Sequence, residues 1–241
     1  MPGSNSSAEG VWRRIGLLVP SSNTVMEVDF YRRLPPGFTL HTGRMYLEST
    51  TPEGESRMLD LHVMPAAHDV GTARPDVIVF GCTSAGAIRG NDYDRELCEL
   101  IAADTGADVL SVISSVRQSI RSRGAGRIGV ITPYIDSLNE RIRASLEADD
   151  GVQVVGIQGL GISNNFAIAE VPPEKIVAFA VEAFDGQAID LLFASCTNFR
   201  AMDAIEGIRE ALGVDVLTSN SAGLEALYRW AGVERPDPRE V

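Results

Sequence analysis

Short runs of bulky apolar residues alternate along the chain with longer segments in which apolar positions recur every three or four residues. The runs have the length of buried strands, and the longer segments have the periodicity of amphipathic helices. Regular alternation of strands and helices is typical of an α/β fold with parallel sheets. The predicted strands are 14–20, 38–46, 77–80, 109–113, 127–133 and 191–194, and the predicted helices include 25–34, 53–72 and 93–105.

This pattern occurs twice in the chain. Arg14–Pro20 has the sequence Arg-Ile-Gly-Leu-Leu-Val-Pro, and Arg127–Pro133, which begins 113 residues later (127 − 14), has the sequence Arg-Ile-Gly-Val-Ile-Thr-Pro. The Cys-Thr pairs that begin at Cys82 and Cys196 are separated by 114 residues (196 − 82). Nearly equal spacings indicate a duplicated βαβα unit of roughly 110 residues. We therefore predict two pseudo-symmetric α/β halves, each with its own parallel sheet.

One apolar strand in each half ends at a cysteine. Cys82 follows the run 77–80, Cys196 follows the run 191–194, and each cysteine is followed by threonine. Open parallel sheets bind ligands at the carboxyl ends of their strands, so we expect both thiols to face one cleft between the halves. A single free cysteine is usually a small buried hydrophobe, but packing alone does not explain why the polar residues that follow are repeated. Cys98 lies in a helical pattern without such a turn and is assigned to the core.

The charge and the cysteine count limit the partners and the compartment. With 33 acidic and 21 basic residues the chain has a formal net charge of −12 at pH 7, which disfavours nucleic acid or an anionic membrane surface as a partner. Three cysteines fit a reducing compartment better than a disulfide framework, and no apolar run is long enough to span a bilayer. We expect a cytoplasmic protein, and the sequence leaves open whether it forms a homo-oligomer.

Few side chains could support a cofactor or a metal. Lys175, the only lysine, lies where a helix would begin, which disfavours a Schiff base. His41, His62 and His68 lie away from both cysteines in the sequence. They also lack the i, i+4 spacing that would place two metal-binding side chains on one face of a helix. Two opposed thiols can exchange a proton or a covalent bond with a planar or α-acidic substrate without help. We therefore predict no cofactor and no metal, and any anionic substrate must be held by local hydrogen-bond donors.

Short polar motifs occur in the order Pro20-Ser21-Ser22-Asn23-Thr24, Gly81-Cys82-Thr83-Ser84, Thr132-Pro133-Tyr134, Asn165 and Ser195-Cys196-Thr197-Asn198. In this order they resemble the aspartate/glutamate racemase superfamily, in particular its maleate cis-trans isomerase and arylmalonate decarboxylase branch. The resemblance covers about residues 13–230. It implies two flavodoxin-like halves with the active site in the cleft between them. The first half is then 13–113 plus 220–241, the second half 114–219, and 1–12 a disordered N-terminus.

The resemblance also implies a small carboxylate or dicarboxylate substrate and roles for individual residues. Cys82 and Cys196 form the catalytic pair, and in arylmalonate decarboxylases the first of these cysteines is replaced by glycine, so Cys82 argues against that activity. The residue pattern leaves Asn164 and Asn165 as alternatives, and the motif match favours Asn165. For Tyr134 and Asn165 an ordinary turn or cap role is an equal explanation of the residue type. The implied substrate-binding residues are Asn23, Thr83, Ser84, Tyr134, Asn165 and Thr197.

Several functions use the same pair of thiols. Our leading hypothesis is cis-trans isomerisation of a maleate-like diacid, in which Cys82 adds to the double bond and Cys196 transfers a proton. The second is racemisation of an amino acid or related α-acid. An amino-acid substrate needs an acidic side chain as partner for its ammonium group, and the matched motifs contain no acidic residue. The third follows from a resemblance of the segment 19–27 to ectoine utilisation proteins of the same superfamily. A ligand-binding protein of this fold would not require both thiols.

Overall fold

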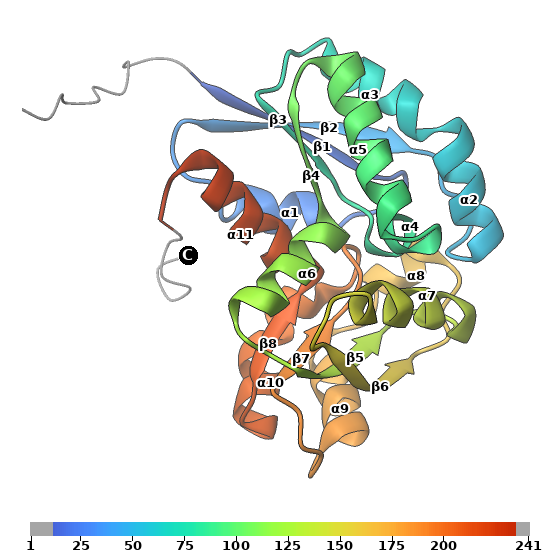
Figure 1. Ribbon diagram of the computed structural model, residues 1–241, viewed down its shortest axis with the longest axis vertical. Helices are drawn as coiled ribbons and strands as arrows, with labels where there is room; N and C mark the ends of the chain where they lie inside the picture. The colour runs from blue at the N-terminus through green and yellow to red at the C-terminus, as the bar shows by residue number, and fades with distance from the viewer. Residues whose placement is uncertain (1–11, 235–241) are drawn as a thin grey trace, which may run out of the picture.

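The computed structural model describes residues 12–234, in which the chain forms two four-stranded parallel sheets, one in each half (Figure 1). All but the last residue of the predicted disordered N-terminus, 1–12, lie outside the described residues. The strand order is β2-β1-β3-β4 in the first sheet and β6-β5-β7-β8 in the second. The strands are β1 (Arg13–Pro20), β2 (Phe38–Met45), β3 (Val77–Phe80), β4 (Asp108–Ser111), β5 (Arg127–Thr132), β6 (Gln153–Gly159), β7 (Leu191–Ala194) and β8 (Asp215–Thr218).

Helices cover both sheets, so the central strands are buried. β3 and β7 consist entirely of buried apolar residues, as expected for strands covered on both faces. The helices are α1 (Met26–Tyr31), α2 (Pro52–Leu61), α3 (Val63–Gly71), α4 (Thr83–Ile88), α5 (Asn91–Thr105), α6 (Val112–Ser122), α7 (Asp136–Glu147), α8 (Asn165–Ala169), α9 (Pro173–Phe184), the 3-10 helix η1 (Arg200–Ala204), α10 (Ile205–Leu212) and α11 (Ser219–Ala231).

The two sheets confirm the predicted duplication. In the first, β1 lies between β2 and β3, with Ile15 opposite Val77; in the second, β5 lies between β6 and β7, with Ile128 opposite Leu191. The strand that carries each cysteine at its carboxyl end therefore occupies the same place in both sheets. The prediction of two pseudo-symmetric halves with parallel sheets is confirmed.

Several element boundaries differ from the prediction, and α1, predicted over 25–34, ends at Tyr31. The helix predicted over 53–72 is two helices, α2 and α3, that meet at His62. Pro65 explains the break, because its ring clashes with the carbonyl of the residue four positions earlier, Leu61, and it cannot donate a backbone hydrogen bond. The strand predicted over 109–113 ends at Ser111, and α6 begins at Val112.

The C-terminal helix α11 leaves the second sheet and returns to the first half. It follows β8 directly, packs along α6 and also contacts α1 (Figure 1). The predicted division into 13–113 plus 220–241 and 114–219 stays a prediction; its boundary falls inside α6, and residues 235–241 lie outside the described part.

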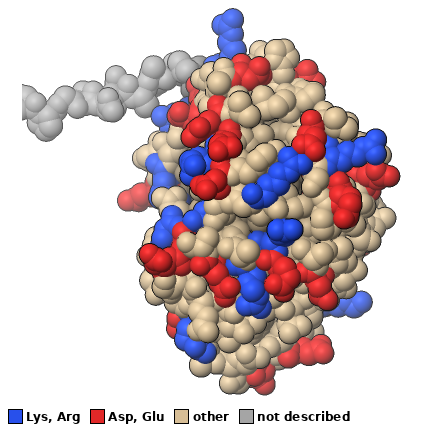
Figure 2. Space-filling view, turned by 45° about the vertical axis from the view of Figure 1, so that its right-hand side comes forward, with Lys and Arg blue, Asp and Glu red and all other residues tan. Residues whose placement is uncertain are grey.

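The surface carries charges of both signs. Acidic and basic side chains are interspersed over the face displayed in Figure 2, and many form ion pairs, such as Arg89 with Asp60 and Arg117 with Asp149. Within residues 12–234, none of the helices has the length and apolar character needed to cross a membrane.

Candidate active site

Cys82 lies where strand β3 ends and helix α4 begins. A Cβ atom at Gly81, the preceding residue, would lie 2.8 Å from the Leu18 carbonyl oxygen on the neighbouring strand, so this turn requires glycine. Cys82 is the N-cap residue of α4, and the nearby backbone N–H of Ala85 opposes the rise that burial causes in the pKa of its thiol. The turn therefore places Cys82 at the start of α4, where it is only 4 % exposed.

Cys196 occupies the equivalent turn after β7, in a backbone conformation that favours glycine. Its φ is +103°, and such strained conformations, which cost about 1–3 kcal/mol, cluster at functional sites. The surrounding contacts hold it there. Its backbone N–H donates to the Ser219 hydroxyl at 3.0 Å, and the Asn198 N–H donates to its sulfur at 3.3 Å. The Tyr134 hydroxyl lies near the same sulfur and lowers the pKa of this thiol, against the larger effect of burial.

Ser219, the first residue of α11, connects the two cysteine turns. Its hydroxyl accepts a hydrogen bond from Thr83 Oγ1 at 2.8 Å and the bond from the Cys196 N–H. Thr83 directly follows Cys82 in the chain. One hydroxyl therefore holds turns from both halves together, in agreement with the predicted single cleft.

Asn23 and Thr197 form a second connection between the halves. Asn23 Nδ2 donates to Thr197 Oγ1 at 3.0 Å, and that hydroxyl donates to the Gly81 carbonyl at 3.0 Å. Asn23 Oδ1 accepts from the backbone N–H groups of Val25 and Met26, where α1 begins. Asn23 thus combines a helix-capping role with a position at the cysteine turns. The Thr197 hydroxyl has only one proton, and it is donated to the Gly81 carbonyl.

Asn165 is directed toward this network, whereas Asn164 has a capping role. The exposed Asn164 side chain accepts from the Ala167 N–H at 3.1 Å and caps α8. Asn165 is buried, and its Nδ2 donates to Ser22 Oγ at 2.9 Å. The Asn165 carbonyl accepts from Asn198 Nδ2 at 2.6 Å. Of the two amides left open by the residue pattern, Asn165 is the one held against the second cysteine turn.

Ser84 links Cys82 to an acidic residue outside the motifs. Ser84 Oγ lies 4.0 Å from Cys82 Sγ and donates to Glu55 Oε1 at 2.5 Å. Glu55, on α2, is fully buried, and burial raises its pKa to about 8 although the Ser84 hydrogen bond opposes the shift. The charge of an ionised Glu55 contributes to the raised pKa values of Cys82, Cys196 and Tyr134. These titratable groups therefore share one region.

Both thiols are neutral at pH 7 in the ligand-free protein. Burial raises the pKa of Cys82 well above its usual range and that of Cys196 to about 11. The Tyr134 hydroxyl lowers the pKa of Cys196, while burial keeps the pKa of Tyr134 itself far above its usual value. Below the pKa of Glu55, the two thiols, Tyr134 and Glu55 are all uncharged, which suits an anionic ligand.

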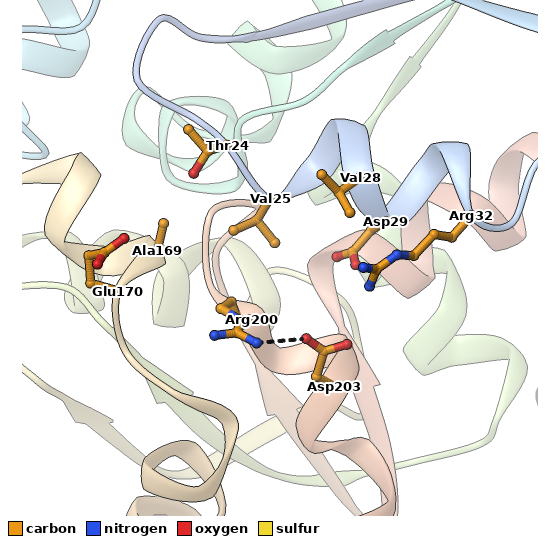
Figure 3. A pocket seen from close by; sticks show the side chains of 9 residues that line it. All are labelled: Thr24, Val25, Val28, Asp29, Arg32, Ala169, Glu170, Arg200 and Asp203. Carbon is orange, nitrogen blue, oxygen red and sulfur yellow. Dashed lines mark hydrogen bonds and ion pairs between the residues drawn. The ribbon is translucent and has the colours of Figure 1, made fainter.

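A surface pocket of about 180 Å³ lies outside this region, along the segment that follows Asn23 (Figure 3). The Thr24 N–H, at its wall, donates to Asn198 Oδ1 at 2.9 Å. Neither cysteine lines the pocket, and each is less than 10 % exposed. The lining residues are Thr24, Val25, Val28, Asp29, Arg32, Ala169, Glu170, Arg200 and Asp203.

The predicted site residues all belong to this connected set, but the sequence reasoning missed Glu55 and Ser219. Ser219 directly follows β8, so the rule that selected Cys82, a polar residue at the carboxyl end of a strand, could have found it. Glu55 gave no such signal. It lies in the first turn of a helix, where acidic residues are common because they favour the helix dipole.

Three comparisons relate the chain to known proteins. Residues 15–239 match the model of the family described as arylmalonate decarboxylase. A maleate isomerase from Nocardia farcinica is 29 % identical over 227 residues, with 90 % of this chain and 89 % of the relative covered. The arylmalonate decarboxylase of Bordetella bronchiseptica is 30 % identical over 219 residues, with 90 % of each chain covered.

A solved structure adds a chemical observation. It is a cysteine-to-serine mutant of Nocardia farcinica maleate cis-trans isomerase with a covalently bound succinylcysteine intermediate. It superposes with a TM-score of 0.83 at 26 % identity, covering 92 % of this chain and 93 % of that one. These findings confirm the resemblance inferred from the motifs. Since the family model spans nearly the whole length of the sequence, the chain belongs to the arylmalonate decarboxylase family.

Proposed function

We propose that this protein is a cofactor-independent cis-trans isomerase of a maleate-like dicarboxylate. The observation that carries the proposal is the pair of buried thiols, Cys82 and Cys196, presented by equivalent turns of the two halves and joined through Ser219. The succinylcysteine of the related isomerase is the thioether that forms when a thiol adds to maleate. That chemistry requires a cysteine, and this chain has one in each turn.

The reaction begins at Cys82. Its thiol gives up a proton, its sulfur bonds to one alkene carbon, and the electron pair of the double bond moves onto the neighbouring carbon and its carboxylate. The Cys196 thiol transfers a proton to that carbon, and the proton released by Cys82 restores the Cys196 thiol. The former double bond is now a single bond about which the adduct rotates. Reversal of the same steps removes the proton, breaks the C–S bond and releases the trans isomer.

Neutral donors stabilise the charge that addition moves onto the carboxylate. The single hydroxyl protons of Thr83, Ser84 and Thr197 are already donated to Ser219, Glu55 and Gly81, so these residues position the two turns. We assign the donor role to the second amide hydrogens of Asn23 and Asn165, together with Tyr134 and the backbone N–H groups of the cysteine turns. Their burial strengthens each hydrogen bond because water does not compete. Both thiols must stay reduced, which supports the predicted cytoplasmic location.

Racemisation uses the same thiols but is less consistent with this site. An amino-acid substrate would need an ionised carboxylate for its ammonium group. Glu55 is the acidic side chain found beside the thiols, and below pH 8 it is mostly protonated. The site therefore favours a dianionic ligand over a zwitterion.

The deciding experiment traps the covalent intermediate. Purified Cys196→Ala protein is exposed to maleate, quenched in acid and digested, and the peptides are analysed by mass spectrometry. We expect the mass of the diacid on the peptide that contains Cys82, because addition can proceed while resolution is slowed. Proton NMR of the wild type should show fumarate formed from maleate. Turnover by the wild type without any adduct in the variant would refute thiol addition at Cys82.

A further inference from the structure

We propose that Glu55 is an additional substrate-binding residue, whose neutral carboxyl group donates a hydrogen bond from Oε2 to a carboxylate oxygen of the substrate. The inference rests on the proposed function, since it takes the substrate to be a dicarboxylate. It assigns a purpose to a buried acidic side chain that the mechanism above does not use.

The side chain of Glu55 is only half satisfied. Ser84 Oγ donates to Oε1 at 2.5 Å, but Oε2 is buried and has no hydrogen-bond partner among the described residues. A buried polar atom without a partner is destabilising and usually marks a site where a ligand or a water completes the hydrogen bonding. In a neutral carboxyl group whose Oε1 accepts from serine, the proton lies on Oε2. The unsatisfied atom is therefore a donor.

The position of Glu55 fits contact with the substrate. Its hydrogen-bond partner Ser84 lies two residues after Cys82, and its charge acts on both thiols and on Tyr134. The first half thus contributes a thiol and an acid to the same region. When a substrate is placed for attack by Cys82, one of its carboxylates therefore lies near Glu55 and Ser84.

Electrostatics require the neutral form when a dicarboxylate is bound. An ionised Glu55 would repel an anionic ligand in a region of low dielectric constant, whereas the protonated acid attracts it. Burial raises the Glu55 pKa to about 8, so the donor form dominates at neutral pH. Because the thiols and Tyr134 have still higher pKa values, Glu55 is the first of these groups to ionise as the pH rises.

Other charged groups lie on the elements packed around Glu55 but do not replace it. The remaining charged side chains of α2 and those of α3 are exposed. Arg89, at the end of α4, pairs with Asp60 on the exposed side of α2. His62, between α2 and α3, is half-buried. An effect of these groups on ligand binding would persist when Glu55 alone is replaced.

Calorimetric titration with succinate tests the proposal, because succinate has two carboxylates and no double bond to attack. If only the neutral acid binds, the wild-type Kd should be constant near pH 6 and rise about tenfold per pH unit above the Glu55 pKa, with uptake of one proton. Glu55→Gln keeps a donor of the same shape that cannot ionise, so its Kd should stay constant. Glu55→Leu should bind about tenfold or more weakly at pH 6.5, since it lacks the donor. Glu53→Gln, at an exposed position of the same helix, is the matched control and should behave as wild type.

The outcomes separate this proposal from the proposed function. The same titrations with maleate on the Cys82→Ser background extend the test to the unsaturated ligand without addition. A wild-type Kd that is independent of pH, or a pH dependence that survives in Glu55→Gln, would overturn the role of Glu55. Tighter binding at high pH would also overturn it, because the ionised acid would then accept from the ligand. Binding with the expected pH dependence but no turnover of maleate would support Glu55 and refute the isomerase.

Discussion

Replacement of Glu55 by glutamine should change how the stability of the protein depends on pH. A carboxyl group whose pKa is raised on folding binds its proton more tightly in the folded than in the unfolded chain. The folded state therefore loses stability as the pH rises from the unfolded pKa toward the folded pKa. Glutamine occupies the same space and cannot ionise, so the variant should not show this loss.

The size of the effect follows from the pKa shift. The Glu55 pKa rises from 4.5 to about 8, and one unit corresponds to about 1.4 kcal/mol, so full ionisation removes about 5 kcal/mol of folding free energy. Between about pH 5.5 and about pH 7.5, both inside this window, the loss is about 3 kcal/mol. Burial also raises the pKa of Asp29 and of Asp94 to about 6, but these groups contribute equally in both proteins.

Urea unfolding followed by circular dichroism at several pH values measures the difference. We expect Glu55→Gln to gain about 3 kcal/mol relative to wild type between the two pH values, with unchanged slopes of free energy against urea. Asp94→Asn serves as a second titration whose change should be complete nearer pH 6. A wild-type-to-variant difference that is the same at every pH would refute the buried, protonated state of Glu55.

Further substitutions test the two turns and the residue that joins them. Cys82→Ser should abolish turnover of maleate, whereas Cys98→Ser, in α5, should retain near-normal activity; an active Cys82→Ser enzyme would remove the nucleophile. Gly81→Ala should destabilise the protein by about 1–3 kcal/mol in urea unfolding, because the added Cβ would lie against a backbone oxygen of β1. Ser219→Ala should lower kcat and cost about 1–3 kcal/mol by leaving buried partners unsatisfied; unchanged kcat would show that the turns are positioned without it.

The repeat in the sequence predicts the arrangement of the sheets because strand order and cysteine position follow from short local patterns. Errors arise where local and tertiary preferences conflict. Val112 and Ile113 have the β-branched side chains typical of strands. They nevertheless begin α6, because β4 ends at Ser111. Pro65 interrupts a segment whose periodicity is otherwise that of one helix.

Some residues of the candidate site could be predicted from the sequence and others could not. The cysteines and their polar neighbours were predictable since they directly follow strands whose ends meet at one cleft. Glu55 was not, because an acidic side chain in the first turn of a helix usually faces water, whereas here α2 packs on α3 and α4 and Glu55 contacts Ser84 of α4. The uses of the Thr197 hydroxyl and the Ser219 hydroxyl depend on contacts between halves, which spacing along one chain does not specify.

The packing of α6 against α11 has a consequence for how the site is assembled. α6 follows β4 and α11 follows β8, so these helices are equivalent in the two repeats and lie where a twofold axis would pass. Two separate copies of the repeat would have to form a dimer through these helices. That dimer, and the active site it contains, would dissociate on dilution. In the joined chain the encounter is intramolecular. Formation of a site that needs one cysteine from each half is thereby independent of protein concentration.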